Sequence, residues 1–253
     1  MAGSIDWQQS GALATVTLSN PARMNAMTRA MWLQLRAVFL DIAARSDLRC
    51  VLVQGADAHF CAGGDISEYP AFRFDPESLM HFHEVEVWGA LQAMRDCPLP
   101  LLALVRGNCM GAGLEIASCC DLRLGAVGSV YGAPIARLGF PMAPREAALV
   151  QQAVGVATAS AMLLAAEIFD ATHMLRCGFL AWTEPDEALQ ARGQALLARM
   201  LALSPQAARL NKQVLRPASP APTPTPAAAY AYADTAQHRE GVQAFLDKRR
   251  PAF

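Results

Sequence analysis

Two short apolar runs, each followed by a glycine-bearing turn, constrain the fold of this chain most strongly. The first run is Cys50–Val53, which Gly55 ends, and the second is Leu101–Val105. A short continuous apolar run is typical of a strand that is buried on both faces, as the strands of parallel sheets are. Because a segment of helical periodicity separates the two runs, we predict an α/β fold with largely parallel strand pairing.

The remaining segments predict one more early strand, followed mainly by helices. Residues Ala12–Leu18 alternate with a period of two and end at Asn20-Pro21, which predicts a strand. Thr28 is a candidate N-cap for a helix that reaches about Ala44. Further helices are expected at 76–94, 114–119, 144–154, 157–166, 171–177, 185–203, 205–215 and 230–248, a strand at 121–126, and a proline-rich loop or linker at 217–229.

Composition excludes several classes of partner. With 253 residues, 53% of them hydrophobic, the chain can bury a large core. A net charge of -1 provides no overall field that would attract nucleic acid or an anionic membrane. No basic start followed by an apolar stretch marks a signal peptide, and no run approaches the ~18 apolar residues of a membrane span. We therefore expect a cytoplasmic protein without a nucleic-acid or membrane partner.

The seven cysteines are scattered without a CxxC pair and without histidines at metal-ligand spacing. Reduced thiols and no metal site are the simplest interpretation. An alternative is that Cys61 or Cys109, each beside a glycine-rich turn, is a nucleophile. Neither has a nearby histidine in the sequence that clearly serves as its base.

The two glycine-bearing turns are the strongest functional signal. They comprise Phe60–Asp65 and Gly107–Glu115. Glycines at the end of a strand let a ligand approach the main chain, and the second turn opens a helix whose first amides have no partner inside the helix. Two such turns could direct two N–H groups at one oxygen, which is how an oxyanion hole is built.

Two nucleotide-binding classes are unlikely on motif grounds. The segment Gly111-Ala112-Gly113 lacks the third glycine of a dinucleotide fingerprint. The lysines are Lys212 and Lys248, so the phosphate-loop pattern that ends in GK[ST] is absent.

Four ordered motifs resemble those of the crotonase (enoyl-CoA hydratase/isomerase) superfamily. Residues 20–26 resemble its N-P-x-x-x-N-A turn, residues 60–66 its F-x-A-G-x-D-[IL] turn, residues 107–115 its G-x-x-x-G-G-G-x-E segment, and residues 120–123 its C-D-x-R. Together with a C-terminal match at 240–249, the resemblance covers nearly the whole chain. It implies a crotonase-like spiral of ββα repeats in residues 1–195, containing the CoA site, and a C-terminal helical trimerisation region in residues 196–253. It also implies a homotrimer or homohexamer.

The resemblance also assigns the site. It implies that the N–H groups of Gly64 and Ala112 polarise the thioester carbonyl of an acyl-CoA. Ala62, Gly64 and Ile66 are expected to contact CoA, and Arg23 stands where a basic residue often meets its phosphates. The polar ending that contains Lys248 is either a solvated tail or a phosphate contact, and we include Lys248 among the CoA-binding residues. Coenzyme A is expected as part of the substrate, with no separate cofactor.

Glu115 matches one of the two catalytic glutamates of hydratases, whereas Ile135 occupies the place of the second. An isoleucine accepts no proton, so Ile135 is expected only to contact substrate, and one-base chemistry at Glu115 gains weight. The other candidates for a second proton-transfer group are His81, His83, Glu84 and Glu86 in the predicted helix 76–94, and Glu146 at the start of a later helix. A solvated helix face is the preferred interpretation of all of them, although His83 and Glu86 could pair.

The predicted function is that of an acyl-CoA enzyme of the hydratase/isomerase type, which stabilises a thioester enolate and uses Glu115 as acid and base. The absence of a second glutamate leaves a CoA-ester decarboxylase or hydrolase as an alternative. A non-catalytic member that binds acyl-CoA or RNA is the third. RNA binding is disfavoured because the helix at 28–44 offers only Arg29 and Arg36 against Asp41.

Overall fold

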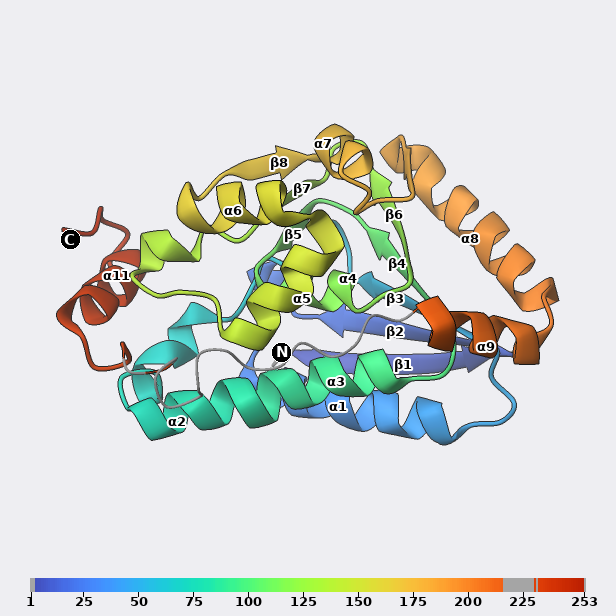
Figure 1. Ribbon diagram of the computed structural model, residues 1–253, viewed down its shortest axis with the longest axis horizontal. Helices are drawn as coiled ribbons and strands as arrows, with labels where there is room; N and C mark the ends of the chain where they lie inside the picture. The colour runs from blue at the N-terminus through green and yellow to red at the C-terminus, as the bar shows by residue number, and fades with distance from the viewer. Residues whose placement is uncertain (1–2, 216–229, 231, 253) are drawn as a thin grey trace.

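The computed structural model describes residues 3–215, 230 and 232–252 and shows a mixed α/β architecture with two sheets (Figure 1). The larger sheet has the order β1-β2-β3-β4-β6-β9 and the smaller the order β5-β7-β8. Within the larger sheet β1 pairs antiparallel with β2 and the later pairs are parallel, as the apolar runs predicted. The strands are β1 (Ser4–Ser10), β2 (Leu13–Ser19), β3 (Cys50–Gly55), β4 (Leu101–Val105), β5 (Asn108–Met110), β6 (Leu122–Ala126), β7 (Val130–Gly132), β8 (Ile168–Asp170) and β9 (Trp182–Glu184).

The helices follow the predicted segments closely. Thr28 caps the first helix by accepting a hydrogen bond from the Met31 N–H at 3.2 Å. The predicted helix 76–94 is continuous but contains a π-helical turn, η3 (Phe82–Val87), between α2 and α3. The helices are α1 (Arg29–Ala44), α2 (Pro76–His81), α3 (Trp88–Asp96), α4 (Ala112–Ser118), α5 (Pro144–Val154), α6 (Val156–Leu164), α7 (Ala171–Arg176), α8 (Asp186–Ala202), α9 (Pro205–Leu215) and α11 (Ala236–Leu246), with 3-10 turns η1 (Pro21–Arg23), η2 (Ile66–Ala71) and η4 (Ile135–Leu138).

The C-terminal part differs from the prediction at one boundary. The last helix begins at Ala236 rather than near Tyr230, because Thr235 is its N-cap and accepts from the His238 N–H at 3.4 Å. The predicted linker 217–229 lies outside the described residues. Residues 195 and 196 both fall within α8, and the division of the chain at that point stays a prediction.

The side chains of alternate residues in β3 and β4 lie on opposite faces of the larger sheet. Val51 and Val53 face a core that α1, α3 and α4 complete. Cys50 and Leu52 face the other way, against Leu196 and its neighbours on α8. Figure 1 shows α1 and α3 side by side, and α8 apart from them across the sheet. Burial of both faces explains why these strands are apolar without alternation. None of the described helices combines the length and the apolar character that a bilayer span requires.

Asn25 connects the early turn to the first glycine turn. It is 1% exposed, and its left-handed backbone (φ 60°) is one that asparagine tolerates better than most residues. Its Oδ1 accepts from the Asn20 N–H at 2.9 Å, and its Nδ2 donates to the carbonyls of Ala56 and His59, both at 2.7 Å. These bonds fix the chain on both sides of the segment that leads into the site.

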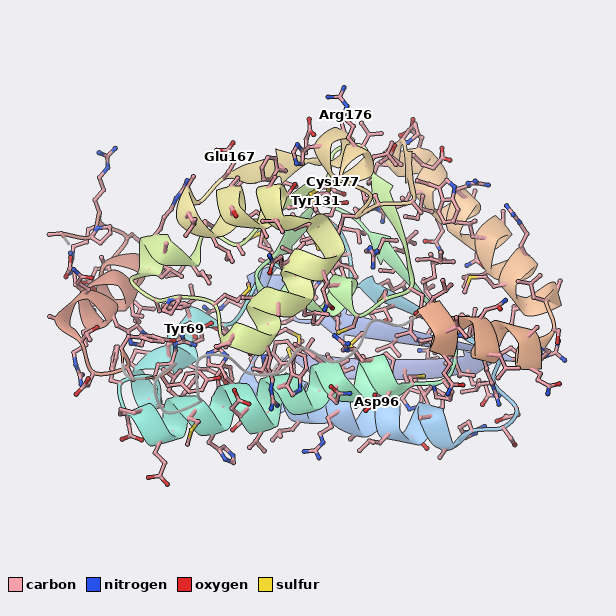
Figure 2. The ribbon with its side chains drawn as sticks, in the orientation of Figure 1. Tyr69, Asp96, Tyr131, Glu167, Arg176 and Cys177 are labelled. Carbon is pink, nitrogen blue, oxygen red and sulfur yellow. The ribbon has the colours of Figure 1, made fainter. Side chains whose placement is uncertain are left out.

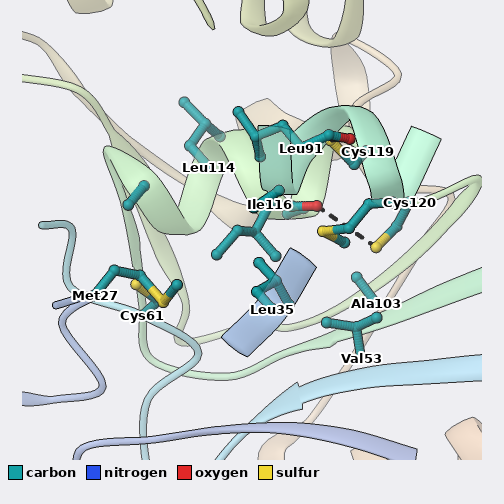
Figure 3. Close-up of a cluster of buried hydrophobic side chains, with 14 of the residues drawn as sticks. Met27, Leu35, Val53, Cys61, Leu91, Ala103, Leu114, Ile116, Cys119 and Cys120 are labelled. Atoms are coloured by element: carbon teal, nitrogen blue, oxygen red, sulfur yellow. Dashed lines mark hydrogen bonds between the residues drawn. The ribbon is translucent and has the colours of Figure 1, made fainter. Parts of the chain in front are cut away.

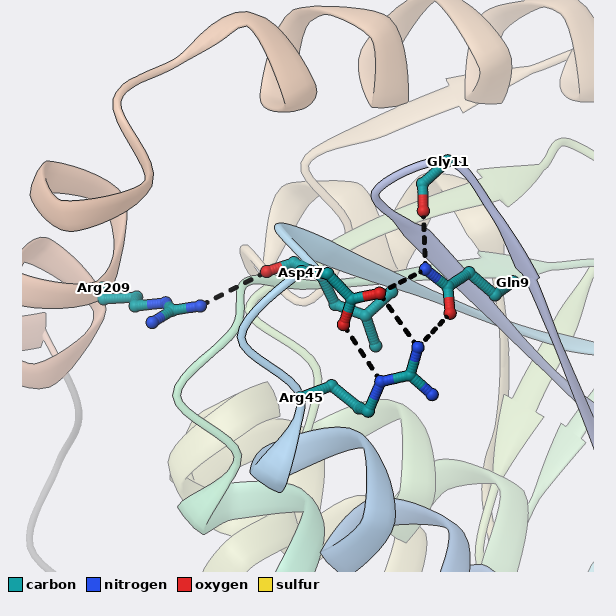
Figure 4. Close-up of polar contacts among 6 residues, drawn as sticks. Gln9, Gly11, Arg45, Asp47 and Arg209 are labelled. Carbon is teal, nitrogen blue, oxygen red and sulfur yellow. Dashed lines mark hydrogen bonds and ion pairs between the residues drawn. The ribbon is translucent and has the colours of Figure 1, made fainter.

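We expect Asn25→Ala to lower the free energy of unfolding by about 3 kcal/mol, because it leaves one buried and two partly buried backbone groups without partners. Chemical denaturation monitored by circular dichroism measures the effect. The control is Gln9→Ala, which removes exposed bonds to Gly11 and Asp47 in the surface network that Figure 4 shows. Its cost should stay below about 0.5 kcal/mol, and equal losses in the two variants would contradict the assignment.

Candidate active site

The two glycine-bearing turns are hydrogen-bonded to each other. The Cys61 N–H donates to the Asn108 carbonyl at 2.9 Å, and the Met110 N–H donates to the Cys61 carbonyl at 2.9 Å. On its other side the first turn pairs with Met27, which donates to the Gly63 carbonyl and accepts from the Asp65 N–H, both at 2.8 Å. The main chain of the site is therefore fixed from both sides.

Glycines allow this close approach. A Cβ atom on Gly113 would lie 2.6 Å from the Cys61 carbonyl oxygen, and one on Gly64 would lie 2.3 Å from the Tyr69 hydroxyl. Gly63 and Gly111 also have positive φ angles of 118° and 47°, which L side chains rarely adopt. Side chains at these positions would push the two turns apart or displace Tyr69.

Both turns open onto one cavity of about 360 Å³. Six of the residues that the sequence predicted for the site line this cavity: Ala62, Gly64, Ile66, Ala112, Glu115 and Ile135. Its other walls include Trp32, Tyr69, Arg73, Phe82, His83, Val87, Met110, Phe140, Met142, Glu146 and Phe245. Figure 2 shows Tyr69 near the N-terminus of α5. The cavity is mostly apolar but contains several polar side chains, as ligand sites usually do.

Two predicted CoA-binding residues lie outside the lining of this cavity. Arg23 is exposed, and its Nη1 lies 3.6 Å from Oδ1 of Asp65. Lys248 follows α11, is exposed, and has a positive φ of 54°. Their contact with CoA stays a prediction. Phe245, on α11, does reach the cavity, although no pattern in the sequence predicted it there.

The backbone amides of Gly64 and Ala112 have no acceptor among the residues that the structure describes. Ala112 is the first residue of α4, so its N–H has no carbonyl one turn earlier within the helix. Gly64 lies between two residues whose backbone groups pair with Met27. Both amides belong to residues that line the cavity, where a ligand oxygen could satisfy them.

Glu115 projects from α4 and is 6% exposed. Its carboxylate accepts no hydrogen bond from the described part of the protein, whereas its N–H donates to the Gly111 carbonyl at 3.0 Å. Burial raises the pKa of Glu115 well above its ordinary value, and the nearby charge of Glu146 raises it further, while Arg73 opposes the shift. The side chain can therefore hold a proton near neutral pH.

Glu146 is a second buried carboxylate, and our expectation of a solvated position for it was wrong. It lies in the first turn of α5, is 3% exposed, and lines the same cavity. Its Oε1 lies 2.8 Å from Nδ1 of His83. Burial raises the pKa of Glu146, and the positive charge of Arg73 partly offsets that effect.

His83 and Arg73 complete a buried chain of polar contacts. Nη1 of Arg73 lies 3.1 Å from Nε2 of His83, and Arg73 is 1% exposed. The guanidinium stands over the rings of Tyr69 and Phe140, 4.4 and 4.1 Å from their centroids. Because a guanidinium only donates, Nε2 of His83 accepts, and its Nδ1–H donates to Glu146. Burial lowers the pKa of His83, and Arg73 lowers it further, which keeps the ring neutral.

The predicted solvated face of helix 76–94 is also incorrect at His83 and Glu86, since both are buried. These two side chains do not pair with each other. Glu86 instead forms an ion pair with Arg29 of α1, and His81 lies 3.7 Å from the same carboxylate. His83 lies on the π-helical turn η3, and such turns often mark functional sites.

The cysteines beside the turns are core residues. Cys61 and Cys109 are fully buried, and Figure 3 shows Cys61 next to Met27 and Leu35 in the apolar cluster. Burial raises the pKa of Cys61 to about 12 and that of Cys109 well above its usual value. Neither is a thiolate near neutral pH, so the nucleophile interpretation loses its basis.

Comparisons with known proteins agree with this geometry. A model of the enoyl-CoA hydratase/isomerase family matches residues 8–253. A Rhodobacter capsulatus protein named probable enoyl-CoA hydratase is 32% identical over 256 residues, covering 99% of this chain and 97% of that protein. The 2,3-dehydroadipyl-CoA hydratase of Escherichia coli K12 is 28% identical over 243 residues, covering 94% and 93% of the two chains.

Solved structures give the same answer. The crystal structure of an enoyl-CoA hydratase/carnithine racemase from Magnetospirillum magneticum has a TM-score of 0.81 and 35% identity, covering 98% of this chain and 94% of that one. The chain therefore belongs to the enoyl-CoA hydratase/isomerase family and is an acyl-CoA enzyme of that family. The predicted crotonase-like fold is confirmed.

Thiol labelling tests the assignment of the cysteines. All seven lie in the described part of the chain, and Cys177 is the one that is not buried. We expect the native protein to react rapidly with Ellman's reagent at no more than this one thiol, and Cys177→Ser to abolish that phase. Rapid labelling at Cys61 in the folded protein would contradict the structure.

Proposed function

We propose that this protein moves protons at the carbons next to a thioester carbonyl, as an enoyl-CoA hydratase or isomerase. In the proposed reaction the amides of Gly64 and Ala112 hold the oxygen of a thioester enolate, and Glu115 is the acid and base. One observation carries the proposal: two amide N–H groups and a buried carboxylate, none of which bonds to any of the described residues, belong to residues that line one cavity.

The amide pair supplies the electrostatic part of catalysis. Negative charge develops on the thioester oxygen when a proton leaves C2 or when a nucleophile adds at C3. Donors that are already fixed need no reorganisation as this charge appears, and a water-poor site strengthens their effect. The hydrogen bonds between the two turns provide that rigidity.

Glu115 supplies the proton transfer. A carboxyl group whose pKa is raised by burial can donate a proton near neutral pH and later recover it. No hydrogen bond from the described residues restrains the carboxylate, so its oxygens are available to substrate.

The acyl-CoA itself is the remaining component. We expect Ala62 and Ile66 to contact CoA at the first turn and Ile135 to contact the acyl chain, since all three line the cavity. Arg23 and Lys248 are exposed cations that could meet phosphates from outside the cavity. No cofactor besides the CoA of the substrate enters the proposed reaction.

Decarboxylation or hydrolysis of a CoA ester is the second candidate. Both reactions could use the same amide pair, and the apolar side chain of Ile135 is the observation that favours them, because it cannot transfer a proton. Release of carbon dioxide would identify decarboxylation and release of free CoA would identify hydrolysis, whereas hydration releases neither product.

A trimer or hexamer in the cytoplasm also belongs to the proposal. Its support is the outer face of α9, where Leu210, Val214 and Leu215 are 54%, 85% and 80% exposed. Large apolar side chains grouped in this way are typical of surfaces that another chain covers.

Replacement of Glu115 by Gln should lower kcat on a 2-enoyl-CoA by about 10²–10⁴-fold, because the isosteric amide cannot transfer a proton. The loss of absorbance of the conjugated thioester measures the rate. Binding of a saturated acyl-CoA should remain near the wild-type level. Full activity in this variant would remove Glu115 from the mechanism, and Glu77→Gln, at an exposed site on α2, is the control.

Ala112→Pro removes the second amide donor with little other change, because proline is well tolerated at the first position of a helix. The expected loss in kcat is about 10²–10³-fold, the usual effect of one missing oxyanion donor. Circular dichroism and the unfolding midpoint check the fold. A correctly folded variant with unchanged kcat would contradict the proposed contact.

A further inference from the structure

Glu146 is the structural feature that the proposed function leaves unused. Glu115 comes from α4 and Glu146 from α5, and both line the cavity. The charge of Glu146 raises the pKa of Glu115, which places the two carboxyl groups within electrostatic range of each other. Ile135, in the position where the family motif has its second glutamate, offers no proton.

The contacts of Glu146 leave one oxygen available. Oε1 accepts from Nδ1 of His83 at 2.8 Å. Oε2 has no hydrogen-bond partner in the described ranges 3–215, 230 and 232–252, and it is not an enclosed orphan atom. One oxygen is therefore held in place while the other can meet a small polar molecule in the cavity.

His83 is itself held by Arg73, so the direction of hydrogen bonding is fixed along the chain. Arg73 donates to Nε2 at 3.1 Å, which leaves the proton on Nδ1. A neutral imidazole that donates to Glu146 favours the carboxylate form of that residue, and the charge on Arg73 acts in the same sense. Among the described residues Glu115 has no such donor. Of the two carboxyl groups, Glu146 therefore ionises first.

Other titratable groups surround this chain of contacts. Tyr69 packs under Arg73, and the ring of Tyr230 stacks on that of His83 at 5.6 Å. Glu84 raises the pKa of Glu146 but is itself engaged by Arg145 at 3.2 Å and by the Tyr230 hydroxyl at 2.8 Å. Within the part of the protein that the structure describes, the titratable groups facing the chain are Tyr69 from η2, Glu84 from η3, Glu115 from α4, Arg145 from α5, Tyr230 and Tyr232 before α11, and His238 on α11.

We propose that Glu146 is a second catalytic residue, which activates water, and that His83 and Arg73 are its positioning residues. This rests on the proposed function and specifies its reaction as hydration of a 2-enoyl thioester. Glu146 removes a proton from water as the water oxygen bonds to C3. The electron pair of the C2–C3 double bond moves toward the carbonyl to form the enolate, and protonated Glu115 gives its proton to C2. Glu146 then returns a proton to Glu115 through solvent, so that the net reaction adds one water.

Two readouts separate this inference from the proposed function. Exchange of the C2 protons of a saturated acyl-CoA with D2O, followed by mass spectrometry, requires the amide pair and Glu115 but no activated water. Hydration of the matching 2-enoyl-CoA requires Glu146 as well. If the wild type catalyses neither, the proposed function fails. If it exchanges protons but does not hydrate, only the present inference fails.

The variant Glu146→Gln should lose about 10²–10⁴-fold in hydration while exchange stays within a few-fold of wild type. Glutamine keeps the volume and can still accept from His83, and the unfolding midpoint reports any loss of structure. Glu187→Gln, an exposed change on α8, is the matched control. Unchanged hydration, or an equal loss of both reactions in a folded variant, would overturn the inference.

A pH profile tests the positioning residues. A catalytic base must be deprotonated, so hydration falls as the pH drops through its pKa. Arg73→Met removes the charge that favours the carboxylate, and the acidic limb of kcat should move up by about one pH unit or more. Arg73→Lys should restore it toward wild type. An unmoved limb in a folded Arg73→Met variant would show that Arg73 is only structural.

Discussion

The pairing of the two glycine turns through backbone hydrogen bonds is the constraint on which the rest of the site depends. Cys61 bonds to Asn108 and Met110, and Met27 holds the first turn from its other side. A carbonyl oxygen can be met by two separate amides only if their separation is fixed to a fraction of an ångström. Parallel strands β3 and β4 bring the two turns to the same edge of the sheet, and glycines then allow main chain to touch main chain.

The same rigidity permits polar groups to be buried at the back of the cavity. Burying an arginine, a histidine and two glutamates costs free energy unless each finds a partner. Arg73 has the faces of two aromatic rings and a histidine nitrogen, and Glu146 has the histidine proton. Glu115 alone lacks a donor among the described residues. A buried carboxyl group without a partner destabilises the fold, so its presence is not explained by stability. A functional role explains it better, and the raised pKa of Glu115 is consistent with proton transfer.

The sequence predicted the elements whose pattern is local and missed what depends on tertiary contacts. Helix α1 and strands β3 and β4 follow from periodicity and apolar runs, and the turn residues Gly64 and Ala112 follow from glycine placement and motif resemblance. Strands β5, β7, β8 and β9 have three residues each, too few to show a period. Strand β1 is not among the predicted elements, although Ile5 and Trp7 alternate with polar residues as in an exposed edge strand.

The errors in the site have one physical cause. Charged residues near a helix start or on a helix face are usually solvated, and that rule gave exposed positions to Glu146, His83 and Glu86. Each is buried because a partner from another segment meets it: His83 meets Glu146, and Arg29 meets Glu86. Sequence separation hides such pairs, since His83 and Glu146 are 63 residues apart. The sequence did contain one signal for a buried Glu146: Ile135 stands where the family motif has a glutamate, and Glu146 follows it a short distance along the chain.

That joint presence has a structural consequence. A carboxylate on η4, where Ile135 lies, would approach the cavity from a short 3-10 turn, whereas Glu146 approaches from the first turn of α5. A carboxylate on α5 needs a different hydrogen-bond partner from one on η4. The π-helical turn η3 supplies that partner, because it presents His83 toward α5. Arg73 then fixes the histidine tautomer from a third segment. Loss of Arg73 or His83 would leave Glu146 buried without the hydrogen bonds that hold it in place. The three residues therefore act as one unit, and Glu146 without the other two would not be held in the same position.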